Sequence, residues 1–515
     1  MNRPVFTLVA LLLVTALAGC VSTPGAAGRP AAQLPAAWHA PLPTATGPAA
    51  TAAAAVPNAL MTGHAATAGA ANALARWWAT FADPVLSQLI DSALAASSNL
   101  AAAQARIERA RASRVAAGAA ALPQLDAVGA IQGGRSIPRQ PAATTASLGL
   151  QAAWEIDLFG GVGASRSAAQ ARLEAAQAGL QAAHVSLAAE TASSYVQLRA
   201  CEAQLVQVRL DAASREETSR LTELSARAGF SAPADAALAR ASAAQSRSLV
   251  LARQAQCETL VKSLVEATAL AEPTLRAQLA AGTAVLPQPA PISVQTLPAE
   301  LLARRPDLAE AARTVEAAAS DQRAAEARER PQIRLSGSLA AASLRSAGVS
   351  TSGSTWALGP LLVSLPVFDG GSSAANSAAA QAEYEAAVAD YQAQVRRALR
   401  EVEAAFVALD STASRQQDAE AAARDFVASL VATQARQRSG LASLFDLEAA
   451  RRNAVQAQSA LVELQAERAS AWISLYRALG GGWSASSAGA APAPVSPALG
   501  SAVSSSAPTS SPSSP

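Results

Sequence analysis

The sequence contains one long segment, Ser372–Ser439, that has neither proline nor glycine. Apolar and aromatic residues recur in it at alternating spacings of four and three, as at Tyr384, Val388, Tyr391 and Val395. This spacing is typical of a helix that buries one seam against neighbouring helices. A helix of this length would extend about 100 Å, several times the width of an ordinary domain. The sequence therefore predicts a rod that spans a distance.

The chain also contains an internal duplication, which sets its architecture. Three landmarks recur about 210 residues further along the chain. They are Pro123-Gln124-Leu125 and Pro331-Gln332-Ile333, Phe159 and Phe368 before glycines, and Arg227-Ala228-Gly229-Phe230 and Arg438-Ser439-Gly440-Leu441. Each repeat is predicted to hold a helix, two strands, one long helix and one shorter helix. We place the repeats at 76–290 and 291–481, with tip turns at about 229–233 and about 440.

The predicted helix lengths are consistent with a layer of side-by-side helices, here called the helical wall, that has a uniform height. Each repeat has one helix of about 65 residues and two of roughly half that length, so two short helices end to end match a long one. The expected helices are 83–121, 164–228 and 233–271 in the first repeat, and 298–328, 372–439 and 441–479 in the second.

Two strands are expected in each repeat, within about 125–158 (125–132 and Leu148–Leu158) and about 333–367 (333–344 and 355–367). Leu148–Leu158 alternates apolar and polar residues, which is typical of a strand with one apolar face. Four such strands cannot close a barrel, because about eight is the smallest number that does so. An open sheet would expose its edges and its apolar face. Three chains would supply twelve strands, enough for a barrel with an apolar exterior and a polar lumen.

Both ends of the chain differ in character from the repeats. Residues 1–19 are expected to be a signal peptide, with Arg3 before an apolar run too short to span a bilayer. Leu17-Ala18-Gly19-Cys20 resembles the bacterial lipobox, which implies acylation of Cys20, and Val21 implies sorting to the outer membrane. The alternative is an ordinary secretory signal with a chance cysteine. We expect 20–75 to be an acylated tether and 482–515 a disordered tail.

Composition argues against several classes of function. The net charge is +2, which gives no basis for nucleic-acid binding. The three histidines are far apart in the sequence, and no zinc-protease, CxxC or Walker-type motif is present. We therefore expect no enzyme, no metal site and no cofactor.

Several motifs in one order resemble the TolC-like outer-membrane factors, in their lipoprotein (NodT/OprM-like) branch, which are exit ducts of RND-type tripartite efflux pumps. The match extends over about Arg76 to Gly481. Its motifs are Trp77-Trp78 with Phe81 and Asp83-Pro84, Trp154-Glu155-Ile156-Asp157-Leu158-Phe159-Gly160, Leu301-Leu302 with Arg304-Arg305-Pro306-Asp307-Leu308, Leu365-Pro366-Val367-Phe368-Asp369-Gly370-Gly371, and Arg438-Ser439-Gly440-Leu441-Ala442-Ser443 with Asp446.

The resemblance implies a mainly α protein with a small transmembrane β part. It implies a homotrimer with a twelve-stranded barrel in the outer membrane of a Gram-negative bacterium, above a twelve-helix periplasmic barrel that is closed at its lower tip. A periplasmic adaptor protein and an inner-membrane RND-type transporter would open it. The chain departs from the family pattern at Arg328-Glu329-Arg330-Pro331 and at Ala449, where many relatives carry an acidic residue.

Two cysteines are candidates for a disulfide. Cys201 and Cys257 lie in consecutive predicted helices, at equal distances from the turn at Gly229. An antiparallel hairpin would place them at one height, about 40 Å above the turn, and an exported protein meets an oxidising compartment. The alternative is two buried free thiols on faces that do not meet.

Candidate functional residues gather at the predicted tip, where three-fold symmetry would turn each side chain into a ring. We hypothesise that Phe445 narrows the closed pore, while Asp446 or Glu448, and Arg452, hold it closed by pairs between helices. The first repeat contributes Asp235 and Arg240 at the same level. The alternative is that these are solvated helix-terminal charges of little energetic weight.

The sequence thus favours a passive trimeric channel that exports small molecules and is anchored by lipid, with a large periplasmic part. Two alternatives stay open. One is the outer-membrane channel of a type I protein secretion system. The other is a lipid-anchored periplasmic coiled-coil scaffold without a pore, although the alternating strands argue against it.

Overall fold

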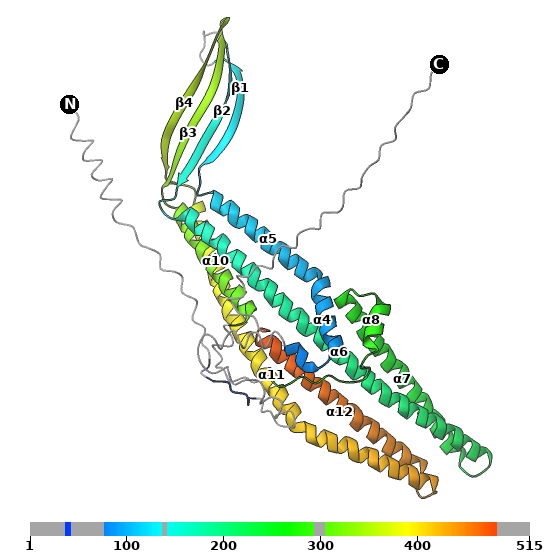
Figure 1. Ribbon diagram of the computed structural model, residues 1–515. Coiled ribbons are helices and arrows are strands. Elements are labelled where there is room, and N and C mark those ends of the chain that lie inside the picture. Colours follow the sequence, from blue (N-terminus) through cyan, green and yellow to red (C-terminus); the bar gives the residue numbers. More distant parts are fainter. Residues whose placement is uncertain (1–34, 36, 43–76, 136–141, 293–303, 482–515) are drawn as a thin grey trace, which may run out of the picture.

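The computed structural model describes residues 35, 37–42, 77–135, 142–292 and 304–481 of the chain (Figure 1). A β-sheet stands at one end of a long helical body, and two helical hairpins lie at the opposite end. The predicted signal peptide with Cys20, most of the tether, the helix start expected at Pro298 and the tail 482–515 lie outside the described residues. The repeat boundaries and these terminal segments stay predictions.

The strands of both repeats form one antiparallel sheet in the order β1–β2–β3–β4. They are β1 (Gln124–Gly134), β2 (Ala143–Ile156), β3 (Gln332–Ser346) and β4 (Val349–Ser364). The two repeats meet where β2 pairs with β3. Two strands in each repeat are therefore confirmed.

One face of the sheet is apolar and the other is polar. Residues directly opposite in an antiparallel register share a face, so Leu150, Leu339 and Trp356 lie on one face of three successive strands. On the other face Gln151 lies opposite Asp126. A soluble monomer rarely exposes an apolar surface of this kind. The large exposed side chains of the apolar face include Ile131, Leu148, Trp356 and Leu358.

The strand β4 begins at Val349, ahead of the expected Thr355. A tight turn at Ala347 and Gly348, both with positive φ, joins it directly to β3. The segment after Val349 is mostly serine, threonine and glycine. It therefore lacks the apolar alternation by which a strand is recognised, although its backbone pairs with β3 throughout.

Two long helices of 67 residues each, α6 (Gly161–Arg227) and α11 (Ser372–Arg438), run along the helical body. The shorter helices are α5 (Ser98–Ala119), α7 (Pro233–Thr268), α10 (Pro306–Arg328) and α12 (Leu444–Ala478). None of the helices that the structure describes is both long enough and apolar enough to cross a membrane.

The helical wall is four helices wide both near the sheet and near the hairpins. Near the sheet the order is α5–α6–α10–α11, and toward the hairpins it is α7–α6–α12–α11. Each long helix therefore contacts one set of short helices in its upper half and another in its lower half. The predicted seam of α11 is buried at Val395, Val402 and Leu409, which confirms the role of its four-and-three spacing.

The helix expected from Asp83 to Ala121 is interrupted in the structure. It consists of α4 (Pro84–Ala96) and α5, with Ser97 between them in an extended conformation. The Ser97 hydroxyl accepts a hydrogen bond from the Leu100 amide (3.3 Å) and so caps α5. A further short helix, α8 (Glu272–Leu279), follows α7 and was not expected.

The main hydrophobic core lies at mid-height, where the start of the first repeat meets the end of the second. Trp77, in the short 3-10 helix η1 (Trp77–Phe81), stacks on Tyr476 of α12 with ring centroids 5.1 Å apart. Tyr195 of α6 donates a hydrogen bond to the Asp83 carboxylate (2.6 Å), which also caps α4. These contacts join elements that are almost 400 residues apart in sequence into one core.

Candidate functional site

The end of the wall farthest from the sheet consists of the hairpins α6–α7 and α11–α12 (Figure 1). Their turns have the same backbone geometry. Gly229 has φ +79° and Gly440 has φ +72°. The following amides, of Phe230 and Leu441, donate back to carbonyls of α6 (2.9 Å) and α11 (2.8 Å), as in the glycine-terminated helix end. Phe230 and Leu441 are 87% and 71% exposed, so each turn presents an apolar side chain outward.

A cluster of charged and polar residues joins the two hairpins just above the tip. Glu448 of α12 accepts hydrogen bonds from Arg215 of α6 (2.5 Å) and from Ser242 of α7 (2.6 Å). Arg451 of α12 donates to Glu448 (2.9 Å) and to Ser214 of α6 (2.7 Å). One carboxylate therefore connects three helices that come from both repeats.

This tip cluster is largely shielded from water. The side chains of Arg215, Glu448 and Arg451 are 15%, 12% and 5% exposed. Asp211, which is 8% exposed, accepts a further hydrogen bond from Arg215 (2.7 Å). Two carboxylates thus balance two arginines, and shielded ion pairs interact more strongly than pairs in water. Loss of one partner would leave an uncompensated buried charge.

Asp446, another residue predicted for the tip, lies in the first turn of α12. Its carboxylate accepts hydrogen bonds from the amide (2.9 Å) and the hydroxyl (2.7 Å) of Ser443, and its amide donates to the Ser443 hydroxyl (3.1 Å). The hydrogen bonds from Ser443 lower the pKa of the Asp446 carboxyl. Within one protomer the Asp446 carboxylate therefore caps α12 and does not join two helices.

The remaining predicted tip residues are at the protomer surface. Phe445 is 64% exposed, Arg240 and Arg452 are exposed, and Asp235 is half-buried in the first turn of α7. Among the described residues of one protomer, no ion pair joins Arg240 or Arg452 to a carboxylate. Their part in closing a pore, like that of Phe445, stays a prediction.

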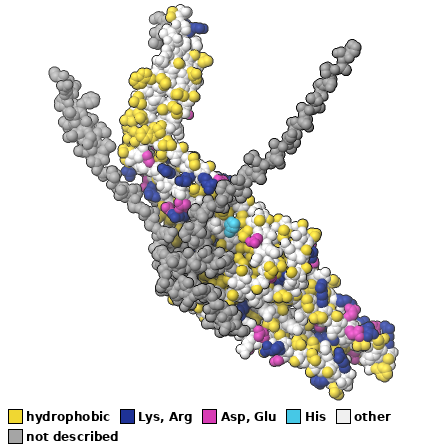
Figure 2. Space-filling model, viewed as in Figure 1, with side chains coloured by type: hydrophobic (Ala, Val, Ile, Leu, Met, Phe, Trp, Pro, Cys, Tyr) yellow, Lys and Arg dark blue, Asp and Glu magenta, His cyan; other side chains and the backbone are white. Residues whose placement is uncertain are grey.

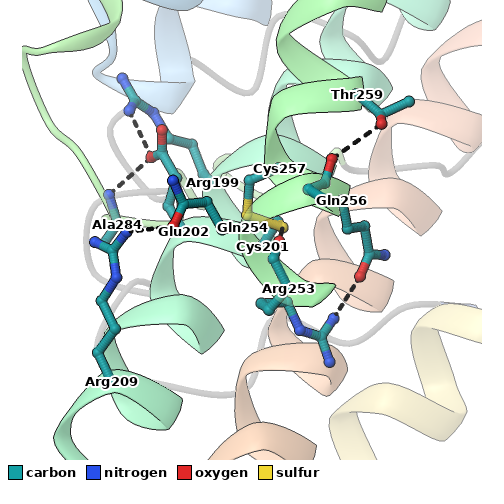
Figure 3. Close-up of a disulfide and its surroundings, with 11 residues drawn as sticks. Arg199, Cys201, Glu202, Arg209, Arg253, Gln254, Gln256, Cys257, Thr259 and Ala284 are labelled. Atoms are coloured by element: carbon teal, nitrogen blue, oxygen red, sulfur yellow. Dashed lines mark hydrogen bonds and ion pairs between the residues drawn. A yellow bond between two sulfur atoms is a disulfide. The ribbon is translucent and has the colours of Figure 1, made fainter. Parts of the chain in front are cut away.

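The hairpin α6–α7 is joined covalently well above its tip. In the structure a disulfide links Cys201 to Cys257, with their Cα atoms 5.6 Å apart (Figure 3). At 1.5 Å per residue the bridge lies about 40 Å above Gly229. Beside it, the fully buried Arg199 donates hydrogen bonds to the Leu279 carbonyl (2.9 Å) and to Glu202 (2.8 Å). These contacts hold the end of α8 against α6.

A family model described as outer membrane efflux protein matches residues 89–270 and 297–481. The chain belongs to the outer membrane efflux protein family. The pyoverdine export outer membrane protein OpmQ of Pseudomonas aeruginosa is 31% identical over 80% of this chain and 88% of its own length. Outer membrane protein OprJ of the same species is 30% identical over 94% of this chain and 97% of its own. The solved outer-membrane channel OprN matches with a TM-score of 0.69 and 29% identity, covering 79% of this chain and 92% of its own.

Family membership confirms the TolC-like fold that the sequence motifs predicted. It also confirms the class of function, because members of the outer membrane efflux protein family form exit ducts for efflux. The sequence analysis predicted that the duct closes at the end of the helical wall farthest from the sheet, where the tip cluster joins the two hairpins. The tip cluster is therefore the candidate functional site.

The double-arginine motif Arg304-Arg305 noted in the sequence has a structural explanation. The side chain of Arg305 is 6% exposed and donates to Asp307 (2.7 Å), to Glu401 of α11 (2.8 Å) and to the Ala478 carbonyl of α12 (3.1 Å). Burial favours the neutral carboxyl of Asp307, but the hydrogen bonds and charge of Arg305 outweigh burial, so the pKa of Asp307 is lowered. The motif thus joins the start of α10 to the other two helices of its repeat.

Sequence reasoning included Glu448 but missed its partners Arg215, Asp211 and Arg451. Their only local signal is spacing: Asp211 and Arg215 are four residues apart, and Glu448 and Arg451 are three apart. Such pairs are common on solvated helix faces. Among the residues that the structure describes, no group of histidine, cysteine, aspartate or glutamate side chains is arranged to hold a metal ion.

Proposed function

We propose that three copies of this chain form a passive exit duct of a tripartite efflux pump. The observation that carries the proposal is the incomplete sheet. Within the described residues, β1 and β4 each pair with one neighbour only. Because the strands alternate in direction, β4 of one copy is antiparallel to β1 of the next, so identical copies can continue the sheet. Three copies give twelve strands and a wall twelve helices in circumference.

The polarity of the sheet supports insertion into a membrane. A closed barrel needs an apolar exterior in lipid and tolerates a polar interior. The face that carries Leu148, Leu339 and Trp356 is apolar, and the face that carries Asp126 and Gln151 is polar. Acylation at Cys20 would add an anchor beside the barrel, because two or more acyl chains hold a protein firmly to lipid.

The tip cluster supports a closed resting state. Glu448 ties α12 to α6 and α7, so the two hairpins of a protomer cannot separate without breaking shielded charge contacts. Opening would need work from outside the duct. We assign that work to a periplasmic adaptor and an inner-membrane RND-type transporter. The exposed Phe230 and Leu441 offer the adaptor apolar contacts at the two turns.

Efflux of small molecules is favoured over the two alternatives. The relative OpmQ is named for pyoverdine export, and the family is one of efflux proteins. A secretion channel would share the fold, but no described feature favours protein cargo. A scaffold without a pore would not need a sheet with one apolar and one polar face.

Reconstitution tests the proposal. The full-length protein, purified in detergent, should have the mass of three chains by light scattering. It should also produce single-channel currents in planar bilayers. A stable monomer, or a trimer that inserts without conducting, would overturn the duct. Transport can then be assigned by comparing the drug susceptibility of a deletion strain with that of a strain complemented by the gene.

A further inference from the structure

The two places where a helix passes into a strand are equivalent in the duplication but differ in charge. Pro123 follows α5 and Pro331 follows α10 at matching positions of the repeats. Before the first proline the chain has Ala120 and Leu122, and before the second it has Arg328 and Arg330 at the same places. The connection from α5 to β1 (the α5–β1 passage) is uncharged. The connection from α10 to β3 (the α10–β3 passage) carries two arginines, with Glu329 between them.

The arginine-bearing passage lies just beneath the apolar face of the sheet. That face ends where Ile156 of β2 pairs with Ile333 of β3. In Figure 2, charged side chains begin directly below the apolar band at the base of the sheet. In a membrane-inserted barrel this level is the boundary between the acyl chains and the headgroups. Arg328 and Arg330 would therefore face the headgroup layer.

A cavity of about 290 Å³ opens at this passage. Arg328 and Pro331 line it from α10 and the passage itself, and Leu158 and Phe159 line it from the segment between β2 and α6. The Arg330 guanidinium lies 5.8 Å from the centroid of the Phe159 ring. The exposed sides of Leu158 and Phe159, at 50% and 37%, add an apolar wall. Glu155 and Asp157 also line the cavity, which thus combines basic, acidic and apolar surfaces.

The two carboxylates of the lining are already engaged by other groups of the protein. Asp157 accepts hydrogen bonds from the amides of Val162 (3.1 Å) and Gly163 (2.7 Å), so it caps α6. Glu155 lies 3.6 Å from Arg334. Among the described residues, no carboxylate forms an ion pair with Arg328 or Arg330. Glu329 and the two carboxylates of the lining offset the charge of the passage, so what distinguishes Arg328 and Arg330 is that neither guanidinium is held in an ion pair among the described residues.

We propose that the α10–β3 passage binds an anionic phospholipid of the surrounding leaflet. Arg328 and Arg330 would hold its phosphate, because guanidinium groups match phosphate oxygens in geometry and charge. Leu158 and Phe159 would contact the start of its acyl chains. The equivalent passage with Ala120 and Leu122 lacks this capacity. The inference rests on the proposed function, since it requires the sheet to lie in a membrane.

The test compares lipids and variants on the intact trimer. Native mass spectrometry in neutral detergent would count bound phosphatidylglycerol, with phosphatidylcholine of the same chains as the zwitterionic comparison. The variant Arg328→Ala/Arg330→Leu copies the uncharged passage. Each arginine near anionic lipid contributes roughly a fivefold factor, so binding of phosphatidylglycerol should fall about thirtyfold. The variant Arg220→Ala/Arg247→Ala removes the same charge from exposed sites of α6 and α7 and should bind as the wild type.

The possible results separate the two proposals. Loss of phosphatidylglycerol in the first variant alone, with the trimer intact, supports the site. Equal binding of both lipids, or equal binding by all variants, overturns it and leaves the duct unaffected. Displacement of the lipid by millimolar inorganic phosphate would indicate a site for free phosphate and would overturn the lipid assignment. A monomeric wild type in the same spectra would overturn the duct, and this inference with it.

Discussion

Replacing Glu448 by alanine tests whether the tip cluster holds the hairpins together. The change removes the acceptor of three hydrogen bonds, from Arg215 (2.5 Å), Ser242 (2.6 Å) and Arg451 (2.9 Å). Arg215 keeps Asp211 as a partner, but Arg451, which is 5% exposed, keeps only a serine hydroxyl. The closed arrangement would then contain an uncompensated cation, which separation of the hairpins would expose to water.

The expected effect is large enough to measure. Removing one partner of a buried ion pair costs about 3–5 kcal/mol. We take the lower value, because Asp211 still compensates Arg215. If the open state does not carry this penalty, the closed state is destabilised by about 3 kcal/mol relative to it. The ratio of closed to open channels then falls by about 100-fold. Glu448→Ala channels should therefore open spontaneously at voltages at which the wild type stays closed.

Single-channel recording in planar bilayers measures this ratio directly. A matched control is Glu217→Ala on α6, because Glu217 pairs with Arg220 at a site where both side chains are more than half exposed. Such a solvent-exposed pair contributes little to stability. In a double-mutant cycle, Arg215→Ala and Glu448→Ala together should cost less than the sum of the two. An intact Glu448→Ala trimer whose open probability equals that of the wild type would refute the reasoning.

Other parts of the wall give further measurable expectations. Cys201→Ser should lower the free energy of unfolding by about 4 kcal/mol, because the bridge to Cys257 closes a loop of 56 residues; reduction of the wild type should lower the denaturation midpoint equally. Arg452→Ala should raise single-channel conductance if the residue forms a ring at the tip, and unchanged conductance would exclude it. The lowered pKa of Asp307 stabilises the fold fully above a pH of about 4, and this contribution is lost as the pH falls through the folded-state pKa. Asp307→Asn should therefore weaken the acid dependence of the melting temperature, and an unchanged dependence would assign it to other groups.

The sequence determined the elements of the fold more fully than their ends. The long helix after Ser372 was predictable because its apolar seam repeats over many turns and no proline or glycine interrupts it. The break at Ser97 was not, because serine within an alanine-rich segment is compatible with helix. The early start of β4 at Val349 was not predictable either, because the local pattern of this segment does not indicate a strand. Its polar residues carry no alternation, and only pairing with β3 reveals the strand.

The candidate site was predictable only in part, because it is formed by contacts between repeats. Glu448 stands beside a glycine turn and attracted attention for that reason. Arg215 and Ser242 lie far from it in sequence, and each belongs to an ordinary alanine-rich helix. Nothing in the local spacing indicates that they converge. They come together because α6, α7 and α12 pack side by side, and that packing depends on the order of all the helices in the wall.

The disulfide described between α6 and α7 determines how the first hairpin can move. Below the bridge, about 40 Å of paired helix extends to the turn with no further covalent tie. Long helices commonly curve with a radius of about 60–100 Å. Over this length, curvature at the gentle end of that range displaces the free end sideways by about 8 Å. Once the contacts of the tip cluster are broken, we expect the hairpin to move outward by bending below the disulfide, while its backbone hydrogen bonds and the disulfide remain intact.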